Sequence, residues 1–472
     1  MHVRSVPRSA IASDVDERVC RTADGGTAAA PDDLSARQAA TVRWLSVCAF
    51  LNACTWSVSS TAQTGLGMQL APSRAHLLAM MSALVSVSAV LQFVLLPVAG
   101  KVSDTFGRKA MMLFRSAIMC VFPATLALRP SYAVFCAQRL MTNMTWSLDK
   151  AAVDAMLADM FESEALASAS ARVMSQSGAA MLLLPMIGGR LAERSFSLCY
   201  GCSSIFSLLK GLVEIFCLQE TKGLGLRKQE SSANDVGWAA AINPFGFLRL
   251  FRSGRELACL ALASAISDFA DGTYEIDRHF GIDVAGMTMT QDGMHASLRG
   301  ASTVVGGRLV SPVLASMTNN RFTLVCNLLG LCYFGVKANA RTPIVYMAAQ
   351  LPYTLGSGRY RSAVVDAQVV KHALRARMKE GETAAAQANA KAVGMVIAPQ
   401  IYSRLFMAFR ETVPGAPYYF CMGLMLVQQA LIWAAGVDAM GDVPPAVLRQ
   451  QKALMEKAAR WKQLDEERRG KG

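Results

Sequence analysis

Residues 77–109 read LLAMMSALVSVSAVLQFVLLPVA followed by GKVSDTFGRK, a long apolar run and then a short basic segment. A helix needs about 20 mostly apolar residues to cross the hydrocarbon core of a bilayer, and Leu77–Ala99 meets that length. A second apolar run, Ala110–Leu128, begins directly after the segment. Because backbone groups must be hydrogen-bonded internally in lipid, the two runs predict two membrane-spanning helices joined by a tight polar loop.

The composition of the whole chain agrees with that of a membrane protein. Of its 472 residues, 53% are hydrophobic and 17% are charged, whereas about 25% are charged in an ordinary soluble domain. This balance excludes a disordered chain, which has low hydrophobicity and high charge. The 12 cysteines are too sparse for a small secreted module held by disulfides. We therefore expect lipid to surround much of the protein.

Apolar runs of similar length recur along the chain. There are twelve of them, in two sets of six. The first set lies near Val42–Ser60, His76–Ala99, Ala110–Leu128, Ser131–Leu157, Ala167–Ala192 and Phe196–Leu218. The second set lies near Glu256–Asp277, Met289–Met317, Phe322–Val336, Pro343–Val365, Ala384–Phe409 and Tyr418–Val437. A membrane barrel would instead need short strands of alternating polarity. The sequence therefore predicts an all-α membrane protein with 12 transmembrane helices in two pseudo-symmetric six-helix bundles.

The polar segments between the runs indicate the domain organisation. We expect a flexible N-terminal tail at residues 1–40, one bundle at 41–221, a linker at 222–254, a second bundle at 255–438 and a basic tail helix at 439–472. Lys and Arg concentrate in alternate loops, so the positive-inside rule places both tails and the linker in the cytoplasm. This placement explains much of the net charge of +13 without invoking nucleic acid.

Two pairs of runs resemble each other in sequence. Val153-Asp-Ala155 in the fourth run aligns with Val365-Asp-Ala367 in the tenth, and Arg190-Leu191 in the fifth aligns with Arg404-Leu405 in the eleventh at almost the same offset. This pattern favours two parallel halves with six helices each. Transporters built from such repeats bind their solute near the middle of the membrane, where the halves meet.

The segment after the first quoted run resembles the signature of the major facilitator superfamily between its second and third helices. That signature is a glycine, an aspartate four residues on, and then Gly-Arg-Lys. The matching residues are Gly100, Asp104, Gly107, Arg108 and Lys109. Thr105 departs from the pattern, which usually has a basic residue there. The resemblance extends over roughly Arg43 to Val437 and implies the fold of that family.

Further motifs of the family follow in order. Arg139 stands in the fourth run where the family often has an arginine, and Asp159 closes that run. The segment Pro185-Met-Ile-Gly188-Gly189 resembles the helix-five motif of the drug and tetracycline antiporter branches, although Leu184 replaces their usual glycine. The resemblance implies a charge cluster of Asp104, Arg108 and Asp159 that locks the outward-facing state.

Charged residues within the runs are candidates for a central cavity, since a charge at mid-bilayer costs at least about 2.5 kcal/mol unless it faces water or a partner. We expect the cavity to be lined by Arg139, Asp149, Asp268, Arg299 and Gln350. Asp268 is the first candidate for a proton-coupling acid, and a structural ion pair with Arg299 is the alternative. The spacing of Asp268, Asp271 and Glu275 predicts that they share one helix face.

Lys210 and Glu214 stand one turn apart in the sixth run, and we expect them to form a structural pair.

These observations predict a secondary transporter that moves a small organic solute by alternating access, with proton coupling or as an uncoupled facilitator. A non-transporting membrane receptor or scaffold is the rival from another class. The sequence contains no P-loop, nucleophile elbow, dinucleotide fingerprint or metal-ligand spacing, so we expect no enzyme activity, cofactor or metal. The expected partners are the solute, the lipid bilayer and, with coupling, protons, and we expect a monomer.

Overall fold

The computed structural model describes residues 31–161, 163–221, 247–376, 378 and 380–436. The linker at 222–246, the N-terminal residues 1–30 and the predicted tail helix at 439–472 therefore lie outside the described residues. Residues 31–40, which we expected in the flexible tail, instead form the first turns of a helix. Pro31 and the two aspartates that follow it favour this start, because proline and negative charge both suit the first turn of a helix.

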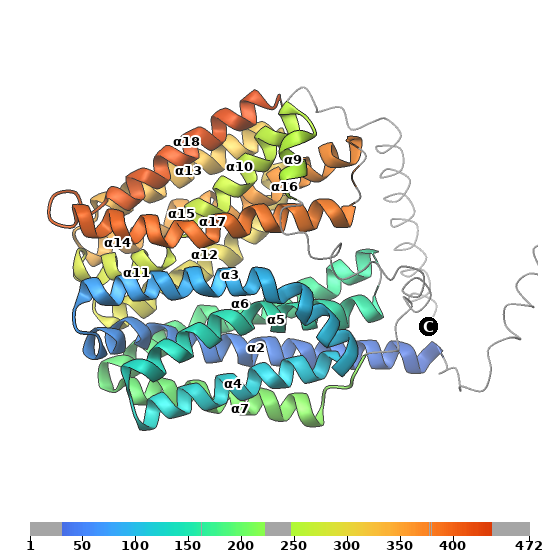
Figure 1. The fold of residues 1–472 in the computed structure, drawn as a ribbon, viewed down its shortest axis with the longest axis vertical. Helices are drawn as coiled ribbons and strands as arrows, with labels where there is room; N and C mark the ends of the chain where they lie inside the picture. Colours follow the sequence, from blue (N-terminus) through green and yellow to red (C-terminus); the bar gives the residue numbers. More distant parts are fainter. Residues whose placement is uncertain (1–30, 162, 222–246, 377, 379, 437–472) are drawn as a thin grey trace, which may run out of the picture.

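Helices form two bundles that lie against each other (Figure 1). The first consists of α2 (Pro31–Leu70), α3 (Arg74–Phe106), α4 (Arg108–Leu128), α5 (Tyr132–Met160), α6 (Ser163–Arg194) and α7 (Phe196–Phe216). The second begins with α9 (Leu248–Arg252), α10 (Arg255–Asp271), α11 (Tyr274–Asp283), α12 (Met289–Ala315) and α13 (Asn319–Asn339). It continues with α14 (Pro343–Ala348), α15 (Gln350–Gly356), α16 (Gly358–Arg375), α17 (Glu380–Phe409) and α18 (Ala416–Ala434).

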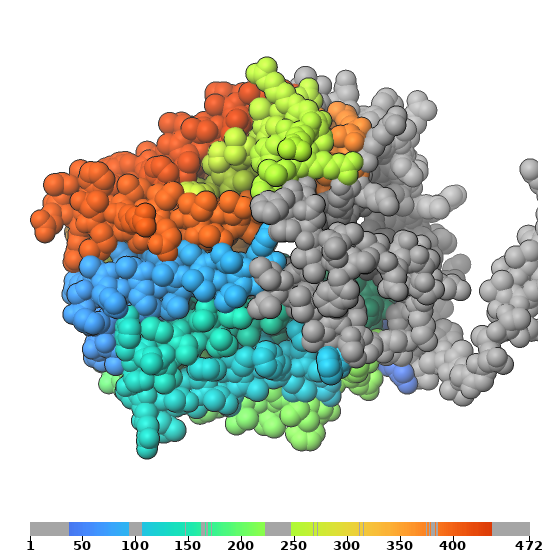
Figure 2. Space-filling model, viewed as in Figure 1, coloured from blue at the N-terminus to red at the C-terminus, as the bar shows by residue number. Residues whose placement is uncertain are grey.

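The long helices run up and down, which gives the molecule two ends. We call the end with Gly107, Leu218 and Gly254 the linker end, on the right in Figure 1, and the end with Ser195 and Gly286 the distal end. The bundles meet where α6 packs on α12 and where α3 packs on α17. Figure 2 shows α3 and α17 side by side along this seam.

Among the described residues, five helical segments are long and apolar enough to cross a membrane. They are Arg74–Phe93, Arg108–Leu128, Phe196–Phe216, Asn319–Asn339 and Ala386–Phe409. Other helices are more polar because part of their surface faces the neighbouring bundle. In α2, for example, Ser60 and Gln63 are buried, and Ser60 contacts the second bundle while Gln63 contacts α5.

Two of the predicted transmembrane runs are broken, which corrects the expectation of continuous helices. The seventh run divides into α10 and α11 at Gly272 and Thr273, and α11 extends to Asp283. Asp268 and Asp271 therefore do not share a continuous helix with Glu275. The side chains of both aspartates lie outside the described residues.

The tenth run divides into α14, α15 and α16, with breaks at Ala349 and Ser357. Pro352 explains the first break, because proline has no backbone N–H to donate and its ring clashes with the carbonyl of the residue four positions earlier, Ala348. Discontinuous helices of this kind form the binding sites of many transporters, since they release backbone groups and helix ends inside the membrane.

The helix-five motif lies at the contact between the bundles, in the distal half of α6. A Cβ atom added at Gly293 of α12 would lie 2.3 Å from the carbonyl oxygen of Pro185, and one at Gly189 would lie 2.4 Å from that of Met289. A Cβ at Gly188 would lie 2.8 Å from Thr61 Oγ1. Only glycine permits such close approaches, so Gly189 and Gly293 set how closely the bundles pack, and Gly188 sets how closely α6 packs on α2 within the first bundle.

We predict that Gly293→Ala lowers the free energy of unfolding by about 1–3 kcal/mol, because the new methyl group must push α6 and α12 apart. Gly178→Ala, also on α6, is the matched control, since its Cβ would lie 3.5 Å from Val304 Cγ2 in ordinary contact. Thermal unfolding of the purified variants in detergent measures the difference. Equal unfolding midpoints for the two variants would show that the close approach is unimportant.

Candidate functional site

A short, highly charged helix lies where the two bundles meet, toward the distal end of the molecule (Figure 1). α11 begins directly after the break at Gly272 and carries Glu275, Asp277 and Arg278, and all three side chains are buried. Their partners come from several other helices, in both bundles. Burial of charge is expensive unless the charges are paired and hydrogen-bonded, so the partners of these three residues define the site.

The first pair joins the two bundles. Arg139 of α5 is buried and forms an ion pair with Glu275 of α11. Its guanidinium also donates a hydrogen bond to Gln63 Oε1 of α2 at 2.9 Å. The predicted central residue Arg139 is thus held by one contact from its own bundle and one from the opposite bundle.

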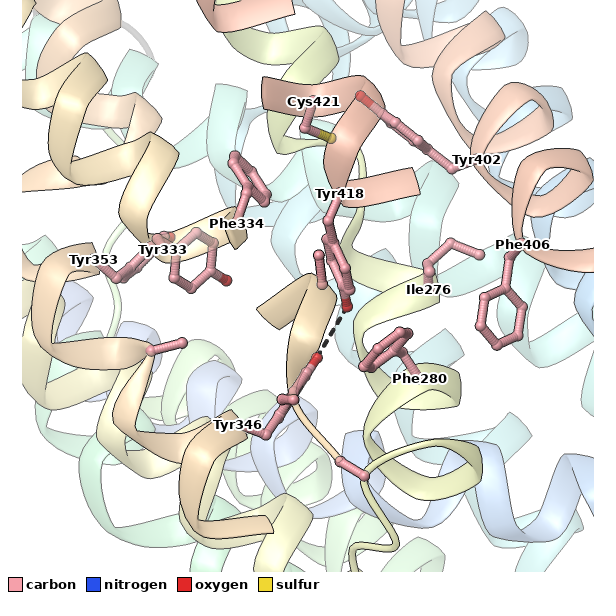
Figure 3. Close-up of a cluster of buried hydrophobic side chains, with 14 of the residues drawn as sticks. Ile276, Phe280, Tyr333, Phe334, Tyr346, Tyr353, Tyr402, Phe406, Tyr418 and Cys421 are labelled. Carbon is pink, nitrogen blue, oxygen red and sulfur yellow. Dashed lines mark hydrogen bonds between the residues drawn. The ribbon is translucent and has the colours of Figure 1, made fainter. Parts of the chain in front are cut away.

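The second group surrounds Asp277. Its carboxylate lies 3.0 Å from Lys337 Nζ of α13, and Tyr418 of α18 donates a hydrogen bond of 2.9 Å to it. Tyr346 of α14 donates to the backbone carbonyl of Asp277 at 2.7 Å. The Tyr346 and Tyr418 hydroxyls lie 3.1 Å apart, and Figure 3 shows this contact between the two tyrosines. Lys337 Nζ lies 4.6 Å, 4.8 Å and 5.8 Å from the ring centroids of Tyr333, Tyr346 and Tyr418. Aromatic faces stabilise a buried cation.

The third group contains Arg278, which again connects the bundles. Arg278 donates a hydrogen bond to the backbone carbonyl of Ser60 in α2, and its Nε lies 3.9 Å from Asp292 Oδ2 in α12. Its guanidinium lies 5.3 Å from the centroid of the Tyr274 ring. Both arginines, Arg139 and Arg278, therefore place positive charge where α2 meets the second bundle.

The predicted residues Arg299 and Gln350 complete the site from α12 and α15. Arg299 Nη1 lies 3.6 Å from Asp277 Oδ2, and the rings of Tyr274 and Tyr353 flank its guanidinium at 5.5 Å and 5.3 Å. Gln350 Nε2 lies 2.6 Å from His295 Nε2, and the His295 ring lies 4.9 Å from that of Tyr346. We refer to all these groups together as the central cluster.

Several polar atoms of the central cluster are buried without a hydrogen-bond partner among the described residues. They include Gln63 Nε2, Arg139 Nε, the Tyr274 hydroxyl, Asp292 Oδ2 and Gln350 Oε1. A buried polar group without a partner costs about 1–3 kcal/mol, so these atoms favour occupation of the region by water or a polar solute. Among the same residues, no group of three or more His, Cys, Asp and Glu side chains is placed to hold a metal ion.

The contacts place Asp149 in a different cluster, inside the first bundle. Lys210 Nζ of α7 lies 3.0 Å from Asp149 Oδ1 and 2.7 Å from Glu214 Oε1, which confirms the predicted pairing of Lys210 with Glu214. Arg115 Nε of α4 lies 3.8 Å from Asp149 Oδ2. Two cations thus balance two anions, and all four side chains are buried. We assign Asp149 to this structural group instead of the central cavity.

Sequence reasoning found part of the central cluster. It identified Arg139, Arg299 and Gln350, but the structure adds Asp277, Arg278, Lys337, Asp292 and His295. The predicted end of the seventh run at Asp277 excluded Arg278, and the predicted end of the ninth at Val336 excluded Lys337. Both residues are charged and directly follow the predicted end of an apolar run, and this position is the sequence signal that could have identified them.

The loop signature lies at the linker end and connects three helices of the first bundle. Gly107 has φ of +101°, and a Cβ there would lie 2.4 Å from Glu220 Oε2, so glycine is required. The Glu220 carboxylate accepts the backbone N–H groups of Arg108 and Lys109 at 3.0 Å each, at the N-terminus of α4. Negative charge is favourable at that position of a helix.

The signature also reaches the end of α5. Arg108 Nε lies 3.5 Å from Asp159 Oδ2, and Thr221 donates a hydrogen bond of 3.1 Å to the same carboxylate. Gly100 and Asp104 fall within α3, but the surroundings of both lie outside the described residues. The Arg108–Asp159 part of the expected charge cluster is therefore in contact.

We predict that Arg139→Gln and Glu275→Gln each lower the free energy of unfolding by about 3–5 kcal/mol, because each leaves an uncompensated buried charge. The double variant should lose less than the sum of the two losses, since it removes both charges. Thermal unfolding in detergent measures all three, with Arg308→Gln as the control, because Arg308 is an exposed arginine on α12. Additive losses would exclude the pairing.

Comparison with known proteins agrees with this architecture. The family model of the Major Facilitator Superfamily matches residues 45–399. Multidrug resistance protein 1 of Bacillus subtilis (strain 168) is 22% identical over 240 residues, which are 51% of this chain and 57% of that protein. Multidrug resistance protein 2 of the same organism is 25% identical over 152 residues, 32% of this chain and 38% of that protein. The aligned parts thus span about half the length of these relatives or less.

Solved structures show the same fold. The human organic anion transporter MFSD10 (TETRAN) aligns with a TM-score of 0.59 at 16% identity, over 84% of this chain and 99% of that one. The nucleoside transporter NupG aligns with a TM-score of 0.67 at 11% identity, over 84% and 99%. A peptide transporter, POT, aligns with a TM-score of 0.64 at 14% identity, over 89% and 98%. Because the family model matches residues 45–399, the chain belongs to the Major Facilitator Superfamily, as an all-helical, multi-pass integral membrane protein.

Proposed function

We propose that this protein is a secondary transporter that moves a small organic solute across a membrane by alternating access. The observation that carries the proposal is the buried Arg139–Glu275 ion pair, which joins the bundles beside several buried polar atoms without partners. An ion pair between bundles contributes energy in one arrangement of the bundles and is lost in another. It is therefore suited to couple the occupancy of a central site to the rocking of the bundles.

Contacts at the distal end support a specific arrangement of the bundles. Asp283 at the end of α11 lies 2.7 Å from Arg74 of the first bundle and 3.4 Å from Arg410 of the second. Glu193 of α6 accepts the backbone N–H of Thr290 at 2.9 Å. We propose that these contacts close the distal end, and that opening of this end breaks them.

The proposed orientation follows from the charge of the loops. Residues 41–221 and 255–438 are the two proposed bundles, and the positive-inside rule puts the linker and both tails in the cytoplasm. A closed distal end then corresponds to an inward-facing state. The loop signature, with Asp104, Arg108 and Asp159, is proposed to form its full charge cluster in the outward-facing state.

The solute does not follow from the fold, because one fold serves many functions. The structural neighbours are described as transporters of organic anions, nucleosides or peptides. The Bacillus relatives are multidrug resistance proteins, which supports export of organic compounds by antiport. Two acids are proposed for proton coupling: Asp268 of α10, from the sequence, and Glu275, from its pair with Arg139.

The test is transport by the purified full chain in proteoliposomes with and without a pH gradient. Ethidium, fluorescein, uridine and dialanine serve as probes of different chemistry. We predict that at least one probe moves, that a pH gradient drives it, and that Asp268→Asn or Glu275→Gln abolishes the response while exchange at equal pH persists. A coupling acid that becomes neutral can no longer exchange a proton for solute.

Glu411→Gln is the control, since Glu411 is an exposed acid near the distal end. Movement without any response to the gradient would replace the antiporter with an uncoupled facilitator. A response that survives both acid variants would remove both residues from the coupling step. If no probe moves under any gradient, the transport proposal fails.

A further inference from the structure

The charges of the central cluster do not balance among the described side chains. Four cations, Arg139, Arg278, Arg299 and Lys337, face three carboxylates, those of Glu275, Asp277 and Asp292. By contrast, the structural group around Asp149 in the first bundle contains two charges of each sign. Among the described side chains the central cluster therefore carries one surplus positive charge, and the side chains of Asp268 and Asp271 lie outside that count.

The surplus can be assigned to one residue, because each of the other cations has a carboxylate of its own. Arg139 pairs with Glu275, and Arg278 lies 3.9 Å from Asp292. Lys337 lies 3.0 Å from Asp277. Arg299 shares that last carboxylate at 3.6 Å, and among the described residues no second carboxylate is recorded within 4 Å of it.

Arg299 is also the most accessible charge of the cluster. Its side chain is 27% exposed, whereas the side chains of Lys337 and Arg139 are 0% and 4% exposed. A charge exposed to lipid at mid-membrane is costly, so the exposed part of Arg299 is expected to face water. The guanidinium lies between the rings of Tyr274 and Tyr353. These rings come from α11 and α15, the elements created by the two breaks.

This arrangement resembles a receptor for a carboxylate attached to an apolar body. A guanidinium offers two parallel N–H donors to a carboxylate, and the tyrosine side chains beside it place apolar carbon next to that position. A single negative charge would neutralise the cluster. A cationic solute would instead add to the surplus in a region of low dielectric constant, where repulsion is strong.

We infer that the central cluster binds a small organic monoanion and that Arg299 receives its carboxylate. The inference rests on the proposed transport function and specifies the class of its solute. Inorganic anions share the same charge, so the test must distinguish an organic carboxylate from a simple halide.

The test is thermal unfolding of the purified full chain in detergent, because a bound solute raises the unfolding midpoint by mass action. Three sets of solutes share their carbon skeletons and differ in the polar group: benzoate, phenylacetate and hexanoate; the three amides; and the three amines. Chloride in place of gluconate forms a fourth arm. We expect stabilisation by the carboxylates alone, with binding about tenfold to a hundredfold weaker in Arg299→Gln. Arg308→Gln on the same helix should leave binding unchanged.

A second measurement needs no solute. Because Arg299→Gln removes the surplus charge, its own unfolding midpoint should equal or exceed that of the wild type, in contrast to Arg139→Gln. A midpoint lowered as far as that of Arg139→Gln would show that Arg299 is a structural partner and would overturn the inference. Arg299→Lys keeps the charge but not the planar donors, and should bind carboxylates with intermediate affinity.

The remaining outcomes separate this inference from the transport proposal. Equal stabilisation by amides or amines, or by chloride, would overturn the organic monoanion, and the transport proposal would stand if a probe is carried in proteoliposomes. If carboxylates fail to bind while uridine or ethidium is carried, only this inference is overturned. If nothing binds and nothing is carried, both are overturned.

Discussion

The structure depends on the pairing of charges that lie inside a membrane-embedded bundle. In the first bundle this pairing is local, since Asp149 and Glu214 neutralise Lys210 and Arg115 between α4, α5 and α7. That group has no part in the contact between the bundles. At the centre the pairing crosses the boundary, because Arg139 of the first bundle pairs with Glu275 of the second. Charge pairing therefore stabilises one bundle internally and links the two bundles to each other.

The breaks in two helices place the groups that make the link. The break after α10 starts a new helix at Tyr274, so Glu275, Asp277 and Arg278 follow within its first turns. The breaks around α15 put Gln350 and Tyr353 on a short helix of their own, beside His295 and Arg299. Discontinuous helices of this kind bring helix ends and charged side chains together, which is an advantage for a binding site.

Much of the fold could be predicted from the sequence because lipid imposes a simple rule on run length and backbone pairing. The loop signature from Gly100 to Lys109 and the spacing of apolar runs were sufficient for the family and the all-helical architecture, and both are confirmed. The motif at Pro185, Gly188 and Gly189 was recognised as a pattern. Its contact with Gly293 involves a second helix, α12, which the sequence of the motif alone does not identify. The structure supplies that partner.

The site was less predictable, because the partners of a buried charge are set by tertiary contacts. Arg139, Arg299 and Gln350 were found as polar residues within apolar runs. Asp149 has the same appearance in the sequence, yet it pairs within the first bundle. Asp277 was read as the last residue of its run, whereas its carboxylate contacts residues of α12, α13 and α18. The helix breaks that bring these residues together depend on Gly272 and Pro352, which run length alone does not detect.

The most direct test of alternating access is to fix the distal end closed. Arg74 and Asp283, in contact at 2.7 Å from opposite bundles, are replaced together by cysteine and joined by a short thiol cross-linker in proteoliposomes, with each single cysteine variant as a control. The account predicts that the cross-link stops transport, that cleavage of the cross-link restores it, and that the cross-linker leaves transport by each single variant unchanged. Undiminished transport through a protein whose distal end is fully cross-linked would contradict it.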